Sequence, residues 1–199
     1  MTDDTLSTNP QIILASSSPR RRELLDQIQV NYEVLPVNID ESHTSGETAE
    51  QFVRRLAVAK AQAGYHQKPH CLSLGSDTIV VVDSTILGKP ENKAHAIEIL
   101  SLLSGRKHQV MTAVAVHSSE YNACVISVSE VEFAELTRSQ IDAYWETGEP
   151  KDKAGAYAVQ GIAAQFIKRM SGSYSGIMGL PLFETAQLLE KSGVKLLAR

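Results

Sequence analysis

The sequence predicts an α/β fold, in which a mixed, twisted sheet is flanked by helices. Apolar runs typical of strands alternate from end to end with segments of helical periodicity, which is the pattern of α/β proteins. Two neighbouring strand-like runs, around residues 114 and 127, have no helical segment between them, which indicates that part of the sheet is antiparallel. The 199 residues, 43% of them hydrophobic, suffice for a sizeable core.

A buried strand and a helix are the first expected elements. Residues 11–15 (QIILA) form a short apolar run typical of a strand. A helix should follow directly, because Ser18 suits the N-cap position and Pro19 suits the first helical position. Side chains at 32–39 alternate enough for a second strand.

Two later helices carry the same start signal, a threonine followed three residues later by a glutamine. This spacing is that of a capping box, in which each side chain bonds the backbone of the other residue. One such helix is expected after Thr48, with Gln51 as its partner, and the other after Thr137, with Gln140 as its partner. The first should end near Gly64, since glycine commonly follows the last turn of a helix.

The remaining elements follow from apolar periodicity and helix signals. A strand at 72–83 is expected to be broken near 75–78, where polar residues typical of turns interrupt the apolar run. The others are a helix at 92–104 closed by Gly105, strands at 108–116, 124–133 and 162–170, and a last helix beginning at Pro181.

Charge and cysteine content exclude several classes of function. A net charge of −4 argues against a surface built to neutralise a nucleic-acid backbone, so no nucleic-acid partner is expected. Cys71 and Cys124 match no metal-ligand or disulfide spacing and suit a reducing, cytoplasmic compartment. No apolar run approaches the ~18 residues of a membrane span, so no membrane partner is expected. We expect a loose, polar arm at 1–10 and a single domain at 11–199.

The segment 16–22 (SSSPRRR) is the first candidate site, because it lies where a strand passes into a helix. Backbone N–H groups and the hydroxyls of Ser16 and Ser18 would converge there, at a helix N-terminus suited to phosphate. Three arginines in the first turn oppose the helix dipole, which suggests an anion that offsets both. Because successive helical residues point ~100° apart, at most one or two of them can face one ligand. A basic solvent face with ordinary capping is the alternative.

Two charged positions before residue 61 are further candidates. Asp40 and Glu41 follow the second expected strand, and adjacent carboxylates can hold a hard divalent cation, although most such pairs are merely solvated. Lys60 falls seven residues after Val53, on the apolar stripe of its helix. Its ammonium should therefore reach a partner, unless its stem packs and the charge extends to water.

Later in the chain, polar residues interrupt apolar runs at three places. Asp77 lies between two such runs, at the mouth of the expected sheet, where ligands of α/β proteins commonly bind, although Gly-Ser-Asp-Thr is also ordinary turn chemistry. Lys89 adds a cation in the rigid turn GKP. The polar loop 152–161 offers the amide of Gln160, which can read a base edge or belong to a plain linker.

Seven motifs follow one another between about residues 11 and 190. They are SSSPRRR, NIDE, AVAKA, GSDTIV, GKP, DKAGAYAVQG and GLPLFET. In this order they resemble the Maf family of nucleotide pyrophosphatases. The resemblance implies a Maf/inosine-triphosphatase-like fold with two lobes around a cleft, a homodimer, and a divalent cation, Mg²⁺ or Mn²⁺. It also implies hydrolysis between the α and β phosphates of a nucleoside triphosphate.

Within that family, the chain is similar to the branch that acts on the pyrimidine nucleotides dTTP and UTP. The pattern of this branch matches at Arg20, Thr78 and Gln160. Two other functions remain open at this point. One is a 7-methyl-GTP-type pyrophosphatase of the same family, and the other is a non-catalytic nucleotide-binding regulator of cell division.

The resemblance also implies a role for each matched residue. Asp77 would be the general base and, with Glu41, a ligand of the metal. The residues expected to bind the substrate are Ser16, Ser18, Arg20, Arg21, Lys60, Thr78, Lys89 and Gln160.

Overall fold

The structure, a computed structural model, describes residues 11–197, so the expected arm at 1–10 lies outside the described residues. A seven-stranded sheet has the order β2-β1-β3-β5-β6-β7, with β4 paired to β3. Its strands are β1 (Ile12–Leu14), β2 (Tyr32–Val34), β3 (Leu72–Val82), β4 (Thr85–Leu87), β5 (Lys107–His117), β6 (Asn122–Phe133) and β7 (Ile167–Ser171). β1 runs parallel to β2 and β3, whereas the other pairs are antiparallel, so the expected mixed sheet is confirmed.

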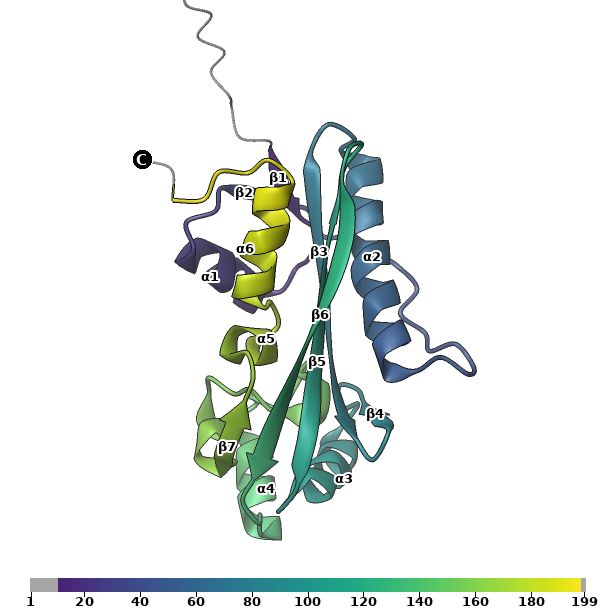
Figure 1. Cartoon of the computed structure of the whole chain (residues 1–199). Coiled ribbons are helices and arrows are strands. Elements are labelled where there is room, and N and C mark those ends of the chain that lie inside the picture. Colours follow the sequence, from purple (N-terminus) through teal and green to yellow (C-terminus); the bar gives the residue numbers. More distant parts are fainter. Residues whose placement is uncertain (1–10, 198–199) are drawn as a thin grey trace, which may run out of the picture.

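Helices cover both faces of the long strands (Figure 1). They are α1 (Pro19–Gln27), α2 (Ala49–Gln67), α3 (Lys93–Leu103), α4 (Arg138–Glu146), α5 (Tyr174–Met178) and α6 (Leu182–Lys191), with 3₁₀ helices η1 (Ala154–Ala156) and η2 (Ile162–Phe166). Side chains alternate along β5, so Met111 and Ala113 pack with α2 while Val114 and Val116 pack with α1 and α6. No helix within residues 11–197 has both the length and the hydropathy to cross a bilayer.

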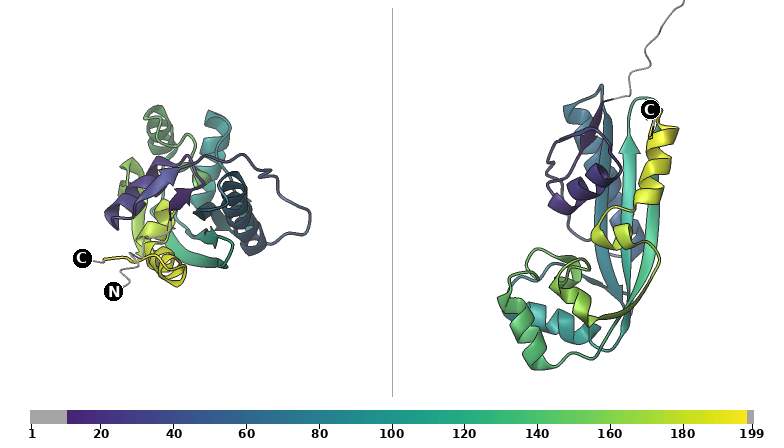
Figure 2. Two further views of the ribbon diagram at one scale, coloured as in Figure 1. Left: turned by 90° about the horizontal axis from the view of Figure 1, so that it is seen from above. Right: turned by 90° about the vertical axis from the view of Figure 1, so that its left-hand side faces the viewer.

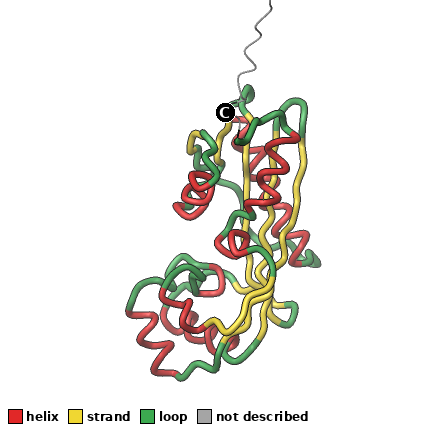
Figure 3. Tube along the Cα trace, turned by 60° about the vertical axis from the view of Figure 1, so that its left-hand side comes forward, coloured by secondary structure: helices red, strands yellow, loops and turns green. Residues whose placement is uncertain are grey.

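The molecule is elongated and has two lobes joined by the long strands β3, β5 and β6 (Figures 1 and 2). The upper lobe consists of β1, β2, α1, α2 and α6 around one end of these strands. The lower lobe consists of β4, α3, α4, η1, η2 and β7 around the other end, where its helices gather (Figure 3). A separate apolar core fills the lower lobe.

The expected helix starts are confirmed. Both capping boxes are present, at Thr48 and at Thr137, and Ser18 is the N-cap of α1. The predicted end of α2 at Gly64 is wrong, because the helix continues to Gln67. Gly64 instead allows a close contact with the sheet, since a Cβ atom there would overlap Ser73 Oγ.

The predicted break at 75–78 is also wrong, because β3 runs without interruption through these residues. Gly75 lies directly beneath α2, where a Cβ atom would overlap the carbonyl oxygen of Ala57 and the amide of Ala61. The polar residues that follow are not solvated as in a turn. Ser76 and Asp77 are buried in the middle of the strand.

Other differences concern short elements. The second strand covers only Tyr32–Val34, and the predicted strand at 162–170 begins as η2 and becomes β7 only at Ile167. β4 and α5 were not expected, because three-residue and five-residue elements leave too few residues for a periodicity.

Candidate functional site

One cleft between the lobes, with a volume of about 940 Å³, is lined by every residue to which the resemblance assigns a role. Asp40, the other candidate carboxylate, is exposed outside this cleft and accepts a hydrogen bond from the Ser42 N–H at 2.9 Å. The upper lobe supplies the loop before α1, the loop before α2, and α2 itself. The lower lobe supplies the loop after β4 and the segment from η1 to η2. The predicted residues in its wall are Ser16, Ser18, Arg20, Arg21, Glu41, Lys60, Asp77, Thr78, Lys89 and Gln160.

A buried ion pair lies at the centre of this cleft. Lys60 Nζ is 2.7 Å from Asp77 Oδ1 and 2.8 Å from Glu41 Oε1. Lys60 and Asp77 are each 8% exposed. The lysine therefore bonds partners inside the cleft rather than extending to water, and the close contact of α2 with β3 at Gly75 holds it there.

Glu41 joins this pair from an exposed loop. Desolvation opposes its ionisation, but the hydrogen bond and the charge of Lys60, with smaller effects of Lys89 and Arg21, outweigh it and lower the pKa of the carboxyl. Glu41 is therefore ionised at neutral pH. Lys60 therefore bonds two carboxylate side chains at once, and Arg21 and Lys89 add positive charge near Glu41.

Arg21 is fixed close to Asp77 and Glu41. Its Nε donates to Gly179 O at 2.9 Å, and its Nη1 donates to Ser16 Oγ at 3.0 Å. Burial lowers the pKa of Arg21, although the nearby Asp77 charge opposes that shift. Gly179 has a φ of +123°, a conformation that favours glycine, so the acceptor carbonyl depends on this residue type.

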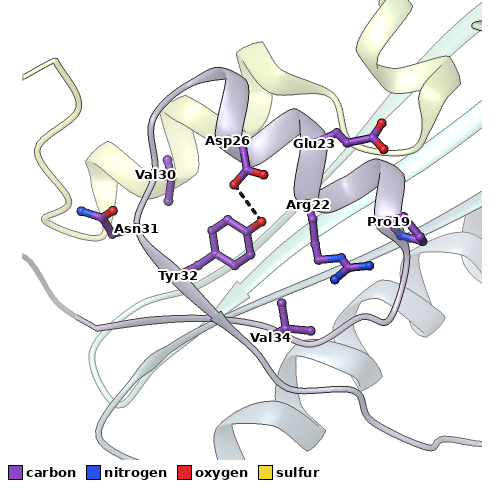
Figure 4. A pocket seen from close by; sticks show the side chains of 8 residues that line it. All are labelled: Pro19, Arg22, Glu23, Asp26, Val30, Asn31, Tyr32 and Val34. Atoms are coloured by element: carbon purple, nitrogen blue, oxygen red, sulfur yellow. Dashed lines mark hydrogen bonds between the residues drawn. The ribbon is translucent and has the colours of Figure 1, made fainter.

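The third arginine of the segment, Arg22, faces elsewhere. It lines a separate pocket of about 540 Å³ between α1 and β2, with Asp26 and Tyr32, which are joined by a hydrogen bond of 2.9 Å (Figure 4). Arg20 and Arg21 line the central cleft. This arrangement agrees with the expectation that at most two of the three arginines face one ligand.

Ser16 and Ser18 form the start of α1 beside Arg21. Ser16 Oγ accepts from the Ser18 N–H at 3.2 Å and from Arg21, so its own proton is left to donate into the cleft. Ser18 makes no side-chain cap hydrogen bond. Its hydroxyl and the first N–H groups of α1 are thus available to an anion at a positively polarised helix end.

The lower lobe adds cations from two loops that are joined to each other. Lys89 is exposed after β4, and the Gly155 N–H donates to Gly88 O at 3.1 Å across the loops. Lys153, which sequence reasoning missed, also lines the cleft. Desolvation lowers its pKa, and the charges of Arg20 and Lys89 lower it further. The only local signal for Lys153 was its place inside the DKAGAYAVQG motif.

Thr78 projects from β3 into the cleft and has a partner that the sequence did not reveal. Thr112 Oγ1 lies 2.9 Å from Thr78 Oγ1 and 2.7 Å from Gly176 O. A hydroxyl has one proton, so when Thr112 donates to the carbonyl, Thr78 donates to Thr112. Thr78 then offers only acceptor lone pairs to a ligand.

This arrangement suits a polyanion beside a reactive water molecule. Four cationic side chains converge on the cleft, from Arg20, Arg21, Lys89 and Lys153, and Lys60 lies between two carboxylates. No group of three or more histidine, cysteine, aspartate or glutamate residues within 11–197 is placed to hold a metal by itself. The site therefore combines a group of cationic side chains, a buried carboxylate, and an exposed amide at Gln160.

Comparison with known proteins gives consistent results. The family model described as "Maf-like protein" matches residues 11–192. The chain is 50% identical over 184 residues to the "dTTP/UTP pyrophosphatase" of Pseudoalteromonas atlantica, covering 90% of this chain and 96% of that protein. It is also 50% identical to the protein of the same name from Acinetobacter baylyi, covering 89% of this chain and 97% of that one.

Among solved structures, the Staphylococcus aureus Ham1 protein matches the fold with a TM-score of 0.52. The match covers 92% of this chain and 99% of that chain at 14% sequence identity. At this identity the likeness concerns the fold alone. It agrees with the expected two-lobed α/β architecture.

Proposed function

The chain belongs to the Maf-like protein family, and on this premise we propose that it hydrolyses dTTP and UTP to the nucleoside monophosphate and pyrophosphate. The observation that carries the proposal is the buried Asp77 carboxylate, which lies in a cleft whose other charged residues are mostly cations. A nucleoside triphosphate offers the negative charge that this surface lacks. Relatives at 50% identity over most of their length are named for the same reaction.

Asp77 would act as the general base. In the free protein one of its oxygens accepts a hydrogen bond from Lys60 at 2.7 Å. When the phosphate oxygens of the substrate bind the ammonium of Lys60, this hydrogen bond would weaken, and the Asp77 oxygen could accept a proton from water. The water oxygen forms the new P–O bond while the bond between the α and β phosphates breaks, and pyrophosphate leaves.

The cationic side chains would position the triphosphate and offset the charge of the leaving group. Phosphoryl transfer requires mainly such positioning and charge stabilisation from a protein. Arg21 and Ser16 form a fixed pair at the start of α1, whereas Lys89 approaches from the other lobe. Binding of one substrate between them would therefore bridge the two lobes.

The residues at the centre of the cleft fit a divalent cation. Glu41 and Asp77 converge on a single point, which Lys60 Nζ occupies at 2.8 and 2.7 Å. Two carboxylates are enough for Mg²⁺ or Mn²⁺ when substrate phosphates and water supply the other oxygen ligands. Such a cation would neutralise developing charge on the phosphates. We propose that it enters with the nucleotide, because Lys60 already satisfies both carboxylates without it.

Base selection would depend on Gln160, supported by Arg20 and Thr78. The amide of Gln160 carries both a donor and an acceptor, which matches the imide edge that thymine and uracil share. Cytosine presents an inverted donor and acceptor pattern and should fit poorly. Thr78 lies on β3, where its hydroxyl is held by Thr112.

The homodimer implied by the resemblance and the cytoplasmic location predicted from the cysteine content are also part of the proposal. Support for the location comes from Cys71 and Cys124, which are both free thiols as a reducing compartment requires. Sedimentation of the purified chain tests the dimer.

A screen of nucleoside triphosphates with detection of both phosphate and pyrophosphate tests the reaction. We expect pyrophosphate from dTTP and UTP in the presence of Mg²⁺ or Mn²⁺. Release of orthophosphate in place of pyrophosphate would contradict the site of cleavage. A preference for 7-methyl-GTP would contradict the substrate assignment, and nucleotide binding without turnover would indicate a regulatory protein instead.

A further inference from the structure

Gln160 lies at the exposed tip of a tight turn whose flanking residues are fixed. Ala158 and Val159 before it are buried, at 7% and 5% exposure. The Gly161 N–H closes the turn by donating to Ala158 O at 3.1 Å. After the turn the chain enters η2 at Ile162. The direction of the Gln160 amide therefore depends on what holds the start of η2.

The carboxylate of Glu149 holds that start. Its Oε2 accepts from the Ile162 N–H at 2.8 Å, and its Oε1 accepts from the Ala163 N–H at 3.1 Å. N–H groups in the first turn of a helix have no acceptor within the helix itself. Glu149 thus supplies both acceptors from 13 and 14 residues earlier in the chain.

Gly161 leaves the space in which this carboxylate lies. A Cβ atom at position 161 would overlap the carboxylate atoms of Glu149. The φ of Gly161 is −109°, so its backbone conformation does not by itself require glycine. Position 161 is therefore a glycine because any side chain there would collide with the carboxylate of Glu149.

Glu149 is itself anchored to α4. The hydroxyl of Tyr144 donates to Glu149 Oε1 at 2.8 Å, and Tyr144 is 2% exposed. Burial, together with this hydrogen bond, raises the pKa of Tyr144, so the hydroxyl keeps its proton. The Glu149 N–H donates to Thr147 Oγ1 at 3.2 Å. Both the backbone and the side chain of Glu149 are therefore fixed relative to one helix of the lower lobe.

We infer that Glu149 is a positioning residue for base selection, acting through the backbone at Gly161 to orient the amide of Gln160. Glu149 is not part of the cleft wall formed by residues 11–197, so it acts without touching the substrate. The inference rests on the proposed function, because it takes Gln160 as the residue that reads the base.

The test is the ratio of kcat/KM for dTTP to that for CTP. Glu149→Gln keeps the size of the side chain but replaces one acceptor oxygen with a donor NH₂, which cannot serve the N–H and O–H groups around it. We expect this ratio to fall by roughly tenfold, the equivalent of one lost hydrogen bond in base recognition. A purely structural role would lower turnover of both substrates equally and leave the ratio unchanged.

Two further variants separate positioning from loss of folding. Gly161→Ala retains the carboxylate but displaces it, so the same loss of selectivity is expected even if Glu149→Gln does not fold. Glu146→Gln is the matched control, because Glu146 lies at the end of the same helix in an exposed ion pair with Lys93. This control should keep the wild-type ratio.

A double variant decides whether Glu149 acts through Gln160. If it does, Gln160→Ala should lower the ratio alone, and adding Glu149→Gln should lower it no further, since coupled residues are not additive. A wild-type ratio in a folded Glu149→Gln or Gly161→Ala protein overturns the inference, as does an additive loss in the double variant. If Gln160→Ala keeps the ratio, base reading by Gln160 is wrong, and the inference fails with it.

Discussion

The two walls of the cleft differ in how far they are fixed before a substrate arrives. In the upper wall, Lys60 and Asp77 are buried and bonded to each other, and Arg21 is held by two hydrogen bonds. In the lower wall, Lys89 and Gln160 are exposed at the tips of loops. Under the proposed function, the upper wall would carry out the reaction, whereas the lower wall would contribute affinity and base selection. Changes in the upper wall should mainly lower kcat, and changes in the lower wall should mainly alter KM or selectivity.

The largest effect is expected for Asp77→Asn in the upper wall. The amide keeps the shape of the side chain but can neither accept a proton nor neutralise a cation. Loss of a general base costs about 10²–10⁴-fold in rate. We expect kcat to fall by that factor while titration calorimetry still detects nucleotide binding. A folded variant with more than about a tenth of the wild-type kcat would rule out Asp77 as the base.

Lys60→Met and Lys89→Met compare one cation from each wall. Methionine keeps the apolar stem of each lysine. Lys60→Met should lower kcat about 10²-fold with a smaller change in KM, as for the loss of a fixed charge at the reacting phosphates. Lys89→Met should raise KM roughly tenfold with little change in kcat, because an exposed charge contributes to binding more than to the reaction. If Lys60→Met and Lys89→Met changed kcat by the same factor and KM by the same factor, the proposed difference between the two walls would be wrong.

The Lys60 variant also has a readout that needs no turnover. Without the ammonium, Glu41 and Asp77 are left without their shared partner, so a divalent cation should bind between them more tightly in the free protein. Titration of Mn²⁺ followed by electron paramagnetic resonance, without nucleotide, measures this affinity. Affinity equal to or below that of the wild type would show that the two carboxylates do not form a cation site.

Gln160→Glu sharpens the comparison in the lower wall. Glutamate keeps the length of the side chain but removes the donor N–H groups. Selectivity for dTTP and UTP over CTP should exceed tenfold in the wild type, because a wrong base leaves buried polar groups unpaired. The substitution should reduce turnover of dTTP and UTP more than turnover of purine nucleotides. Equal losses for all nucleotides would exclude Gln160 from base recognition.

Substitution of His108, which contacts Tyr157 of the lower wall, should change activity least but should clearly change how stability depends on pH. His108 Nε2 lies 2.9 Å from the hydroxyl of Tyr157, which lines the cleft. Desolvation lowers the pKa of His108 from 6.5 to about 4, so the folded protein resists protonation of the ring. Its contribution to stability is complete above pH 6.5 and is lost progressively as the pH falls toward 4.

Urea unfolding at pH 6.5 and pH 4.5 checks this effect. The depressed pKa should cost about 2 kcal/mol of unfolding free energy over that interval. His108→Gln retains a hydrogen-bonding group but does not titrate. Between pH 6.5 and pH 4.5 the variant should therefore lose about 2 kcal/mol less unfolding free energy than the wild type. The kcat of the variant at pH 7.5 should stay within about twofold of the wild type, because His108 is not among the residues that line the cleft.

Local signals in the sequence were sufficient for most of the fold. The capping boxes at Thr48 and Thr137 and the proline at the start of α1 correctly mark three helices, because the interactions span only a few residues. The break predicted at 75–78 failed because a close contact between α2 and β3 explains Gly75, and sequence alone does not show that contact. The division into an arm and a single domain at residues 11–199 stays a prediction.

In the candidate site, too, some features could be predicted from the sequence and others could not. The resemblance to the Maf family identified residues that do line one cleft, although their roles stay predictions. Contacts between residues that lie far apart in the chain were not predicted. Arg21 bonds a carbonyl 158 residues away, and Glu149 bonds backbone groups 13 and 14 residues away. No periodicity or motif spacing relates such pairs, so only the folded chain reveals them.

The order in which the two apolar cores are completed has a consequence for synthesis on the ribosome. The lower core uses residues between Val80 and Ile177, whereas one upper core joins Ile12 to Leu189 near the other end of the chain. A growing chain can therefore complete the lower core first. The carbonyl of Gly179 that fixes Arg21 also emerges late. A nascent chain that lacks this segment lacks one of the two hydrogen bonds that hold Arg21, so the upper wall of the cleft is complete only when translation is nearly finished.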